Sequence, residues 1–343
     1  MQRPGIDHTG ISGMSQAASF PDREQVRTGR LHVVAAVIRN RRGRVLLARR
    51  HPGQHQGGRW EFPGGKVEPG EDPQQALVRE LREELGIEAK RLRPLIRIPH
   101  DYPDRRILLD VWEVLRWRGQ PIGREGQPVR WVAESELDYH PLPEANRPVV
   151  TACRLPGRYL ITPEPEHPER FLNLLELALL QRDIRLVQLR ARRLSGAALE
   201  ALVQRVKACC DAHGARLLVN RHLELAERHG LGVHLAQDQL EILTRRPLSS
   251  RRLVAASCHD ARSLALASGL GLDFAVLSPV LPTASHPEAR PLGWDQFEAL
   301  VARATLPVYA LGGLQEHHFP EARAHGAQGI AAIRGLWPGL EAV

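Results

Sequence analysis

The chain has 343 residues, of which 43% are hydrophobic and 25% charged, values that are ordinary for a folded globular protein. This length exceeds the usual size of one domain, so we expect at least two domains with sizeable cores. The formal net charge is +8, but basic residues are dispersed among acids and aromatic residues are only 5%, which disfavours nucleic acid as the main partner. A basic surface would also attract a triphosphate.

The first 29 residues are rich in Gly, Ser, Gln, Asp and Arg and lack the apolar stretch of a secretory signal, so we expect a disordered tail. Both methionines, Met1 and Met14, lie in this tail, which leaves the true start codon open. No apolar run reaches about 18 residues, so no membrane span is expected. The cysteines, which are Cys153, Cys209, Cys210 and Cys258, have no metal-binding spacing. They favour thiols in a reducing cytoplasm.

Residues 65–87, GKVEPGEDPQQALVRELREELGI, carry the strongest chemical pattern in the chain. If the second half is helical, Glu80, Glu83 and Glu84 share one face, because they are three and four positions apart. Like charges this close repel one another, and a divalent cation with oxygen ligands would remove the conflict. The alternative is an exposed, charge-rich helix with accidental ion pairs, which the fixed spacing of the whole segment disfavours.

This segment resembles the Nudix box at every specified position. The matching residues are Gly65, Glu71, Arg79, Glu80, Leu81, Glu83, Glu84, Gly86 and Ile87. The resemblance implies that residues 30–150 form a Nudix hydrolase domain, an α/β/α sandwich with a mixed sheet. It also implies hydrolysis of a nucleoside diphosphate linked to another moiety, with Mg²⁺ as the cofactor and Mn²⁺ as a substitute.

Four segments outside the box narrow the resemblance to the MutT branch of this family. They are Glu61–Lys66, Tyr102–Arg105, Gly123–Gln127 and Glu144–Pro148. MutT enzymes remove pyrophosphate from 8-oxo-dGTP. The resemblance therefore implies 8-oxo-dGTP as the substrate, with attack of water on the β phosphorus and release of 8-oxo-dGMP and pyrophosphate.

The same resemblance assigns expected roles to individual residues. The metal ligands would be the Gly64 carbonyl, Glu80, Glu83, Glu84 and Glu125. Arg79 would hold the carboxylates by charge-assisted hydrogen bonds, and Glu71 would orient Arg79. The nucleotide would be bound by Arg50, His55, Phe62, Arg105 and Asn146. Glu125 could act as a ligand or as a base, and the choice between Glu80 and Glu125 as the base stays open, since both tasks require a carboxylate.

Asn146 is the residue expected to select the base. Its amide offers a donor and an acceptor in one plane, which can pair with O6 and the protonated N7 of 8-oxoguanine, whereas guanine presents two acceptors there. The alternative is ordinary turn chemistry, because Asn before Arg-Pro suits a loop. For His55, a solvated loop histidine is a comparable alternative.

The remainder of the chain alternates short apolar strands with helices. After a linker at residues 151–157, we expect a small (β/α)₈ barrel over residues 158–343. The predicted strands are Tyr159–Thr162, Leu186–Arg190, Arg216–Asn220, Gly232–Ala236, Leu253–Ser257, Phe274–Val280, Pro307–Gly312 and Gly329–Ile333. The clearest predicted helices are Pro168–Gln181 and Gly196–His213.

Four segments of this barrel resemble thiamin phosphate synthase and its thiazole tautomerase relatives. They are Val187–Arg190, Val233–Gln237, Ser278–Thr283 and Leu311–Leu314. Two glycines after the seventh predicted strand, Gly312 and Gly313, suit a phosphate ligand held by backbone N–H groups.

The barrel departs from the synthase at the positions that bind its metal. Arg221 follows Asn220 where the family has an aspartate, Gln239 replaces the second aspartate, and His286 replaces a lysine. Arginine cannot ligate a cation, so synthase activity is not expected. His234 and His259 fit either an acid–base role or a structural one.

Three hypotheses therefore remain for the chain. The first is an 8-oxo-dGTP diphosphatase that serves nucleotide-pool sanitation and DNA replication fidelity, with a degenerate or regulatory barrel. The second is a bifunctional enzyme whose barrel retains thiamin phosphate synthase or thiazole tautomerase activity. In the third, the barrel is a ligand-binding or assembly module without chemistry.

Overall fold

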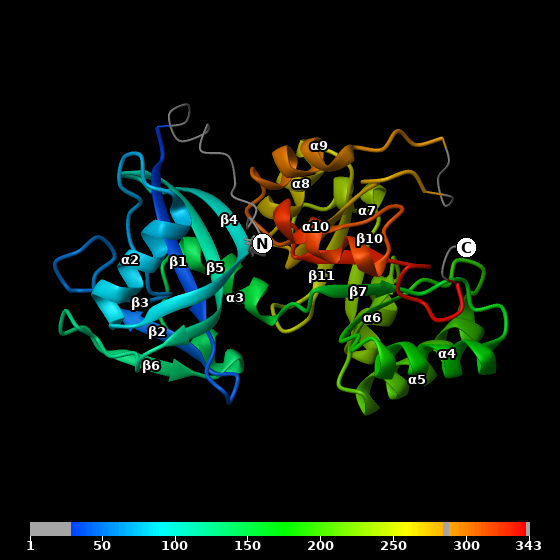
Figure 1. Cartoon of the computed structure of the whole chain (residues 1–343). Helices are drawn as coiled ribbons and strands as arrows, with labels where there is room; N and C mark the ends of the chain where they lie inside the picture. The colour runs from blue at the N-terminus through cyan, green and yellow to red at the C-terminus, as the bar shows by residue number, and fades with distance from the viewer. Residues whose placement is uncertain (1–28, 284–287, 341–343) are drawn as a thin grey trace, which may run out of the picture.

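The computed structural model describes residues 29–283 and 288–340. Figure 1 shows two lobes, with the amino-terminal half of the chain in one and the carboxyl-terminal half in the other. The expected disordered tail, apart from Gly29, lies outside the described residues, as does His286.

The first lobe contains two three-stranded sheets. In one, β1 (Leu31–Ile38) pairs in parallel with β5 (Arg106–Arg118), which pairs antiparallel with β4 (Glu88–Asp101). In the other, β2 (Val45–Arg49) lies between β3 (Trp60–Glu61) and β6 (Val129–Val132). The expectation of mixed strand pairing is confirmed, although the strands divide into two sheets.

Helices cover both sides of β1, because its side chains alternate between two hydrophobic clusters. Val34 and Ala36 pack with Leu77 and Leu81 of α2 (Pro73–Leu85). The residues between them on β1 face the cluster that contains α3 (Arg147–Arg154). The short 3₁₀ helices η2 (Glu134–Tyr139) and η3 (Glu144–Asn146) precede α3. This arrangement confirms the expected α/β/α layering.

Local signals explain why α2 begins and ends where it does. The Asp72 carboxylate accepts hydrogen bonds from the backbone N–H groups of Gln74 and Gln75, and Pro73 occupies the first turn. Gly86 ends the helix in the left-handed conformation, with φ of 67°. The helix thus presents its carboxylates at a defined position on the sheet.

The second lobe is a closed barrel of eight parallel strands, as expected. The strands are β7 (Arg158–Ile161), β8 (Leu186–Leu189), β9 (Arg216–Asn220), β10 (Gly232–Leu235), β11 (Val254–Cys258), β12 (Phe274–Leu277), β13 (Val308–Ala310) and β14 (Gly329–Ala332). The predicted sixth strand was too long: β12 ends at Leu277, and Pro279 cannot donate a ladder hydrogen bond.

Seven helices surround the described barrel. They are α4 (Pro168–Gln181), α5 (Gly196–Ala212), α6 (Leu223–His229), α7 (Gln237–Ile242), α8 (Ala261–Gly269), α9 (Gly293–Val301) and α10 (Phe319–Ala324), and a 3₁₀ turn, η4 (Glu316–His318), precedes the last. The interior is filled by a separate cluster that includes Tyr159, Phe274 and Tyr309. The barrel is therefore packed at its centre.

The first lobe covers the end of the barrel where the strands begin. Gln328, directly before β14, donates from Nε2 to the carbonyls of Ala152 and Leu155 at 3.1 and 2.9 Å. Arg323 of α10 donates to the carbonyl of Pro94 on β4 at 2.9 Å. Residues 151–154 of the expected linker form the last turn of α3. The carboxyl ends of the strands lie at the opposite end of the barrel.

A buried carboxylate joins the two lobes. Glu113 of β5 contacts Arg39 at 2.8 Å, Arg93 at 2.5 Å and Arg323 of the barrel at 3.3 Å. Burial raises the pKa of Glu113, but the three guanidinium groups outweigh it, so the pKa is below its ordinary value. Burial lowers the pKa of Arg323 to about 10. The interface therefore depends on mutual charge compensation.

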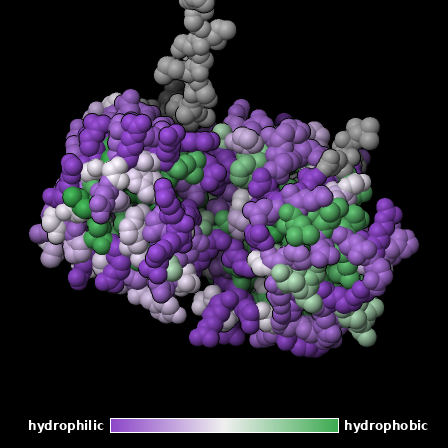
Figure 2. Space-filling view, turned by 60° about the horizontal axis from the view of Figure 1, so that its bottom comes forward, coloured by the Kyte–Doolittle hydropathy of each residue, from purple (hydrophilic) through white to green (hydrophobic). Residues whose placement is uncertain are grey.

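On the face drawn in Figure 2, the surface is largely hydrophilic, with the larger hydrophobic areas on the barrel lobe. Among the helices described, none is both long enough and apolar enough to cross a membrane. The cysteines Cys153, Cys210 and Cys258 are buried and Cys209 is half-buried; all four are free thiols, as expected.

Candidate functional site

The predicted site begins where the Gly64-Gly65 turn passes under α2. The carbonyls of Pro63 and Gly65 accept hydrogen bonds from Ala36 and Val34 of β1, so the turn is held along that strand. A Cβ on Gly65 would lie 2.2 Å from the carboxyl carbon of Glu80, and Gly64 has φ of 149°. Glycine is required here because the backbone and the carboxylate approach too closely for a side chain.

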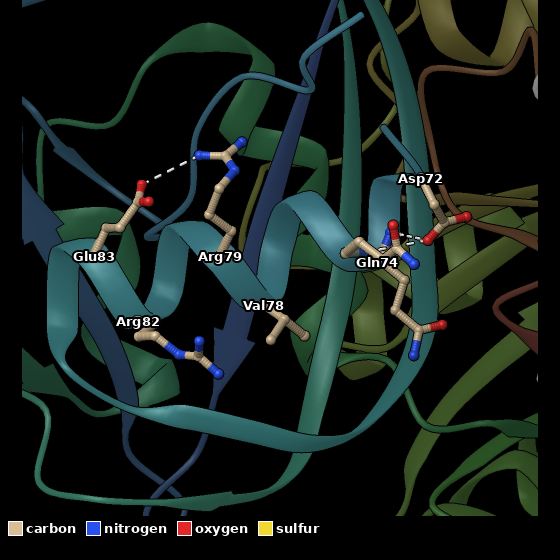
Figure 3. Close-up of a pocket in the computed structure, with 7 residues that line it drawn as sticks. Asp72, Gln74, Val78, Arg79, Arg82 and Glu83 are labelled. Carbon is tan, nitrogen blue, oxygen red and sulfur yellow. Dashed lines mark hydrogen bonds and ion pairs between the residues drawn. The ribbon is translucent and has the colours of Figure 1, made fainter. Parts of the chain in front are cut away.

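Arg79 binds the carboxylates around it. Its Nε and Nη2 contact both oxygens of Glu71 at 3.0 and 2.9 Å, and its Nη1 contacts Glu80 at 2.9 Å and Glu83 at 3.2 Å. Figure 3 shows Arg79 and Glu83 rising from one side of α2, with Arg82 on the other. The bidentate bond to Glu71 is the largest cause of a raised Arg79 pKa.

Glu84 lies deeper, where several carboxylates crowd together. One of its oxygens accepts a hydrogen bond from the Gly64 N–H at 3.3 Å. Burial raises the pKa of Glu84 to about 8, and repulsion from Glu61, Glu80 and Glu125 adds to the effect. Burial likewise raises the pKa of Glu61 to about 7 despite its ion pair with Arg50. Ionisation of these carboxyl groups in the folded protein is therefore unfavourable.

The donor chemistry of this cluster fits a divalent cation. Carboxylate and carbonyl oxygens are the ligands that Mg²⁺ prefers, and the guanidinium of Arg79 already provides positive charge between Glu80 and Glu83. Within residues 29–283 and 288–340, no three His, Cys, Asp or Glu side chains are placed so that they could hold a metal ion. Arg79 contacts one oxygen of Glu80 and one of Glu83, two of the expected metal ligands.

Glu125 comes from the loop that precedes β6. This loop is fastened to the end of α2, because the Arg124 N–H and the Gln127 side-chain amide both donate to the Glu84 carbonyl, at 2.9 and 3.2 Å. Glu125 itself is exposed, and its charge contributes to the raised pKa values of Glu80 and Glu84. The structure thus brings Glu125 near the helix carboxylates.

Asn146 is buried, with 7% of its surface exposed. It occupies the N-cap position of α3, but its side chain makes no capping hydrogen bond. Instead, its Oδ1 accepts a long hydrogen bond, 3.5 Å, from the backbone N–H of Phe62, and Phe62 is itself buried. Turn chemistry therefore does not account for this side chain.

Two other residues that were predicted to bind the nucleotide, His55 and Arg105, differ in how far they are buried. His55 lies 3.2 Å from Asp104 and packs edge-on against Tyr102, with ring centroids 4.9 Å apart, so it is not simply solvated. Arg105 pairs with the adjacent Asp104 at 2.9 Å and is largely exposed. His55 is thus packed against Tyr102, whereas Arg105 lies at the surface.

Two residues that the sequence reasoning did not single out also belong to this region. Tyr102 accepts a 3.4 Å hydrogen bond at its hydroxyl from the Ala145 N–H, beside Asn146. Glu61 binds Arg50 and lies within electrostatic reach of Glu84. The signal for both was their position inside segments that match the MutT branch.

The barrel contains a second candidate site, a cavity of about 920 Å³ where the strands end. Gln188 donates to the Asn220 side chain at 2.9 Å, and both line the cavity. The Oε1 of Gln188 is buried without a hydrogen-bond partner within the described chain. Burial is the main cause of a lowered Arg190 pKa in the same wall. Among the described residues, the cavity wall therefore combines an unpaired acceptor oxygen with a partly buried guanidinium.

The residues at the expected metal-binding positions of the barrel do not fit a metal ion. Arg221, in the position of the expected aspartate, donates to both oxygens of Asp238 at 2.8 and 2.6 Å. Gln239 donates to the Arg221 carbonyl at 2.9 Å. The carboxylate of Asp238 is thus neutralised by a guanidinium, which cannot itself ligate a cation.

The buried His234 predicts how the stability of the protein depends on pH. It is 2% exposed, between the Tyr159 hydroxyl at 3.1 Å and the Ser257 hydroxyl at 2.9 Å, and burial lowers its pKa to about 3. The unfolded chain takes up this proton below pH about 6.5 but the folded chain does not, so stability falls as the pH drops from about 6.5 to 3. Urea unfolding at pH 7 and pH 5 should differ by about 2 kcal/mol more in the unaltered protein than in His234→Gln.

The exposed His167 is a matched control for this measurement. The His167→Gln variant should retain the acid dependence of the unaltered protein. Equal pH dependence in His234→Gln and the unaltered protein would contradict the prediction.

Comparison with known proteins agrees with the two-part architecture. A family model described as NUDIX domain matches residues 34–152, and one described as thiamine monophosphate synthase matches residues 158–336. An 8-oxo-dGTP diphosphatase from Escherichia coli (strain K12) is 41% identical over 125 residues, which are 36% of this chain and 97% of that protein.

Two further relatives show the range of activities among similar proteins. A CTP pyrophosphohydrolase from Escherichia coli (strain K12) is 43% identical over 122 residues, covering 36% of this chain and 90% of that protein. A thiamine-phosphate synthase from Methanospirillum hungatei JF-1 is 32% identical over 183 residues, covering 52% of this chain and 89% of that protein. The chain therefore belongs to the Nudix family in its first half and to the thiamine monophosphate synthase family in its second.

Proposed function

We propose that the Nudix half of this chain hydrolyses 8-oxo-dGTP to 8-oxo-dGMP and pyrophosphate with Mg²⁺. The observation that carries the proposal is the buried Asn146 side chain, which does not cap its helix and lies against the Phe62 backbone. A buried amide that reads the base can reject a nucleotide with the wrong hydrogen-bonding edge.

The metal ligands in this proposal are the Gly64 carbonyl, Glu80, Glu83, Glu84 and Glu125, with Mn²⁺ able to replace Mg²⁺. When bound, the cation neutralises charge on the phosphates and makes hydroxide accessible near neutral pH. Arg79 and Glu71 keep the carboxylates oriented, while Arg50, His55 and Phe62 bind the nucleotide. Arg105 would join them only by turning away from Asp104.

Steady-state kinetics on several nucleotides test the proposal. With Mg²⁺, kcat/KM should be higher for 8-oxo-dGTP than for dGTP, CTP, ADP-ribose or dinucleoside polyphosphates. CTP is included because one relative is a CTP pyrophosphohydrolase. Equal kcat/KM for 8-oxo-dGTP and dGTP would refute the specificity, and absence of all turnover would refute the hydrolase class. In ¹⁸O-labelled water, attack on the β phosphorus places the label in pyrophosphate.

The variant Asn146→Ala tests the residue that carries the proposal. The preference for 8-oxo-dGTP over dGTP should fall about 10–100-fold, because the amide makes its favourable pair only with the oxidised base. The ratio of kcat/KM for the two nucleotides measures this preference. Glu144→Ala, at an exposed position of the same turn, is the control and should keep the ratio. An unchanged ratio in Asn146→Ala would exclude Asn146 as the base reader.

For the barrel, we propose small-molecule binding without synthase activity, a proposal that rests on the cavity and on the Arg221–Asp238 pair. Incubation with hydroxymethylpyrimidine pyrophosphate and thiazole phosphate, with Mg²⁺, should yield no thiamin phosphate. Accumulation of thiamin phosphate would show that this pair does not block the reaction.

A further inference from the structure

Glu61 is an acidic residue that no expected catalytic or metal-binding role explains. It lies on the short strand β3, and only 20% of its side chain is exposed. Its negative charge acts on Glu84, which already suffers repulsion from Glu80 and Glu125. A further carboxylate at this position is unfavourable unless a positively charged partner compensates it.

The positively charged partner of Glu61 is Arg50. The Nη1 of Arg50 donates to the Glu61 carboxylate, and its Nε donates to the His55 carbonyl at 2.8 Å. The backbone of Arg50 is also paired with Arg59 and Gly58. The loop at residues 51–59 is therefore fastened to β3 through the Arg50 side chain.

Two bonds fix the plane of the Arg50 guanidinium. Arginine has five N–H donors in a rigid fork, and the bonds at Nε and Nη1 orient the rest of that fork. Within the described residues, the Nη2 group makes no hydrogen bond to the protein. An anionic or carbonyl oxygen of a substrate is a suitable acceptor for these donors.

Glu61 is related to both parts of the proposed site, the expected base reader and the expected metal ligands. The residue that follows it, Phe62, donates its N–H to Asn146. The negative charge of Glu61 also acts on the carboxylate of Glu84. The partner of Arg50 is therefore adjacent in sequence to a residue that contacts the expected base reader, and its charge acts on an expected metal ligand.

We propose that Glu61 is a positioning residue, which sets the Arg50 guanidinium for contact with the bound nucleotide and thereby determines nucleotide affinity. This inference rests on the proposed nucleotide hydrolase function. Because Glu61 acts through Arg50, its loss weakens ground-state binding while the carboxylates that carry out the chemistry remain.

The test compares Glu61→Ala, Glu61→Gln, Arg50→Ala and the double variant in the full-length chain. Two quantities are measured for each: the KM and kcat for the best nucleotide substrate, and the Kd for its non-hydrolysable α,β-methylene analogue by calorimetry. Circular dichroism and thermal unfolding confirm that each variant is folded. Glu88→Ala removes an exposed carboxylate, paired with Lys90, and is the matched control.

Glu61→Ala should raise KM and Kd about ten-fold and leave kcat within about three-fold, as expected for loss of one charge-assisted contact made equally in ground and transition states. Glu61→Gln retains an acceptor oxygen for Arg50 and should recover part of the affinity. The double variant should bind as Arg50→Ala does, because Glu61 has no effect without Arg50. Glu88→Ala should match the unaltered protein.

Three results would overturn the inference. One is a fall in kcat with unchanged Kd; another is a shifted Mg²⁺ requirement in Glu61→Ala, which would place Glu61 in the metal cluster. The third is a double variant whose loss of affinity equals the product of the losses in the two single variants. If the unaltered protein turns over no nucleotide, the proposed function fails as well; if it turns over dGTP and 8-oxo-dGTP equally, only the specificity fails and the Glu61 test proceeds with dGTP.

Discussion

Replacing Glu84 by glutamine should abolish most nucleotide hydrolysis and yet stabilise the metal-free protein. Glu84 is a proposed metal ligand, so kcat/KM should fall by about 10³-fold. The same carboxyl group is buried and crowded by Glu61, Glu80 and Glu125, which raises its pKa to about 8. Removing it should increase the free energy of unfolding in EDTA at pH 7 by about 1–3 kcal/mol.

The sign of this stability effect follows from the raised pKa. Between pH about 4.5 and 8, the unfolded chain releases the Glu84 proton but the folded chain retains it, so the stability of the metal-free protein falls as the pH rises through this window. Glu84→Gln should lose that pH dependence. Mg²⁺ should raise the melting temperature of the unaltered protein more than that of the variant.

The helix offers a matched control at Arg82, which points away from Glu83 in Figure 3. Arg82→Gln changes one charge on the same helix and should leave kcat/KM nearly unchanged. If Glu84→Gln instead destabilises the metal-free protein, the crowding of carboxylates is not a cost, and the stability part of the prediction is wrong.

Glu113→Ala should destabilise the whole chain by about 3–5 kcal/mol, because it removes the shared partner of Arg39, Arg93 and Arg323. Arg323 is 6% exposed and comes from the barrel, so its uncompensated charge would lie in the interface between the lobes. Urea unfolding followed by circular dichroism measures the loss. We also expect two separated transitions, since the lobes lose their common buried charge cluster.

Glu88→Ala is again a suitable control, because Glu88 pairs with Lys90 at an exposed position of β4 in the same sheet. Exposed pairs contribute about 0–1 kcal/mol. A loss below about 1 kcal/mol in Glu113→Ala would show that the three arginines are adequately solvated without it. Glu113→Gln should lie between the two, since it keeps the hydrogen-bond acceptor but not the charge.

Local patterns in the sequence were sufficient to predict the strands of the barrel and the carboxylate-bearing helix of the Nudix lobe. Helix α2 follows from the capping residue Asp72 and the terminal Gly86, and α4 has the bounds that were predicted for it. The short barrel strands follow from apolar runs between turns. The error at β12 arose because Val280 continued the apolar run beyond Pro279, whereas the hydrogen-bond ladder could not.

Long-range contacts were beyond such patterns. The sequence shows Glu61 and Arg50 as two charges 11 positions apart, and nothing local requires that they meet. Likewise, Glu113 and Arg323 are separated by 210 positions and come together only because the Nudix lobe covers the amino end of the barrel. Pairing over such distances depends on the packing of whole elements, which local propensity does not encode.

The sequence by itself determined the two families, the carboxylate-bearing helix and the absence of a metal-binding aspartate after β9, since each of these depends on residue type at fixed local spacing. Only the tertiary structure decided that Asn146 is buried against Phe62 without capping α3, that Arg221 pairs with Asp238, and that Glu61 pairs with Arg50. The physical reason is that burial, charge compensation and hydrogen-bond partners are properties of the packed chain, set by elements that are distant in sequence.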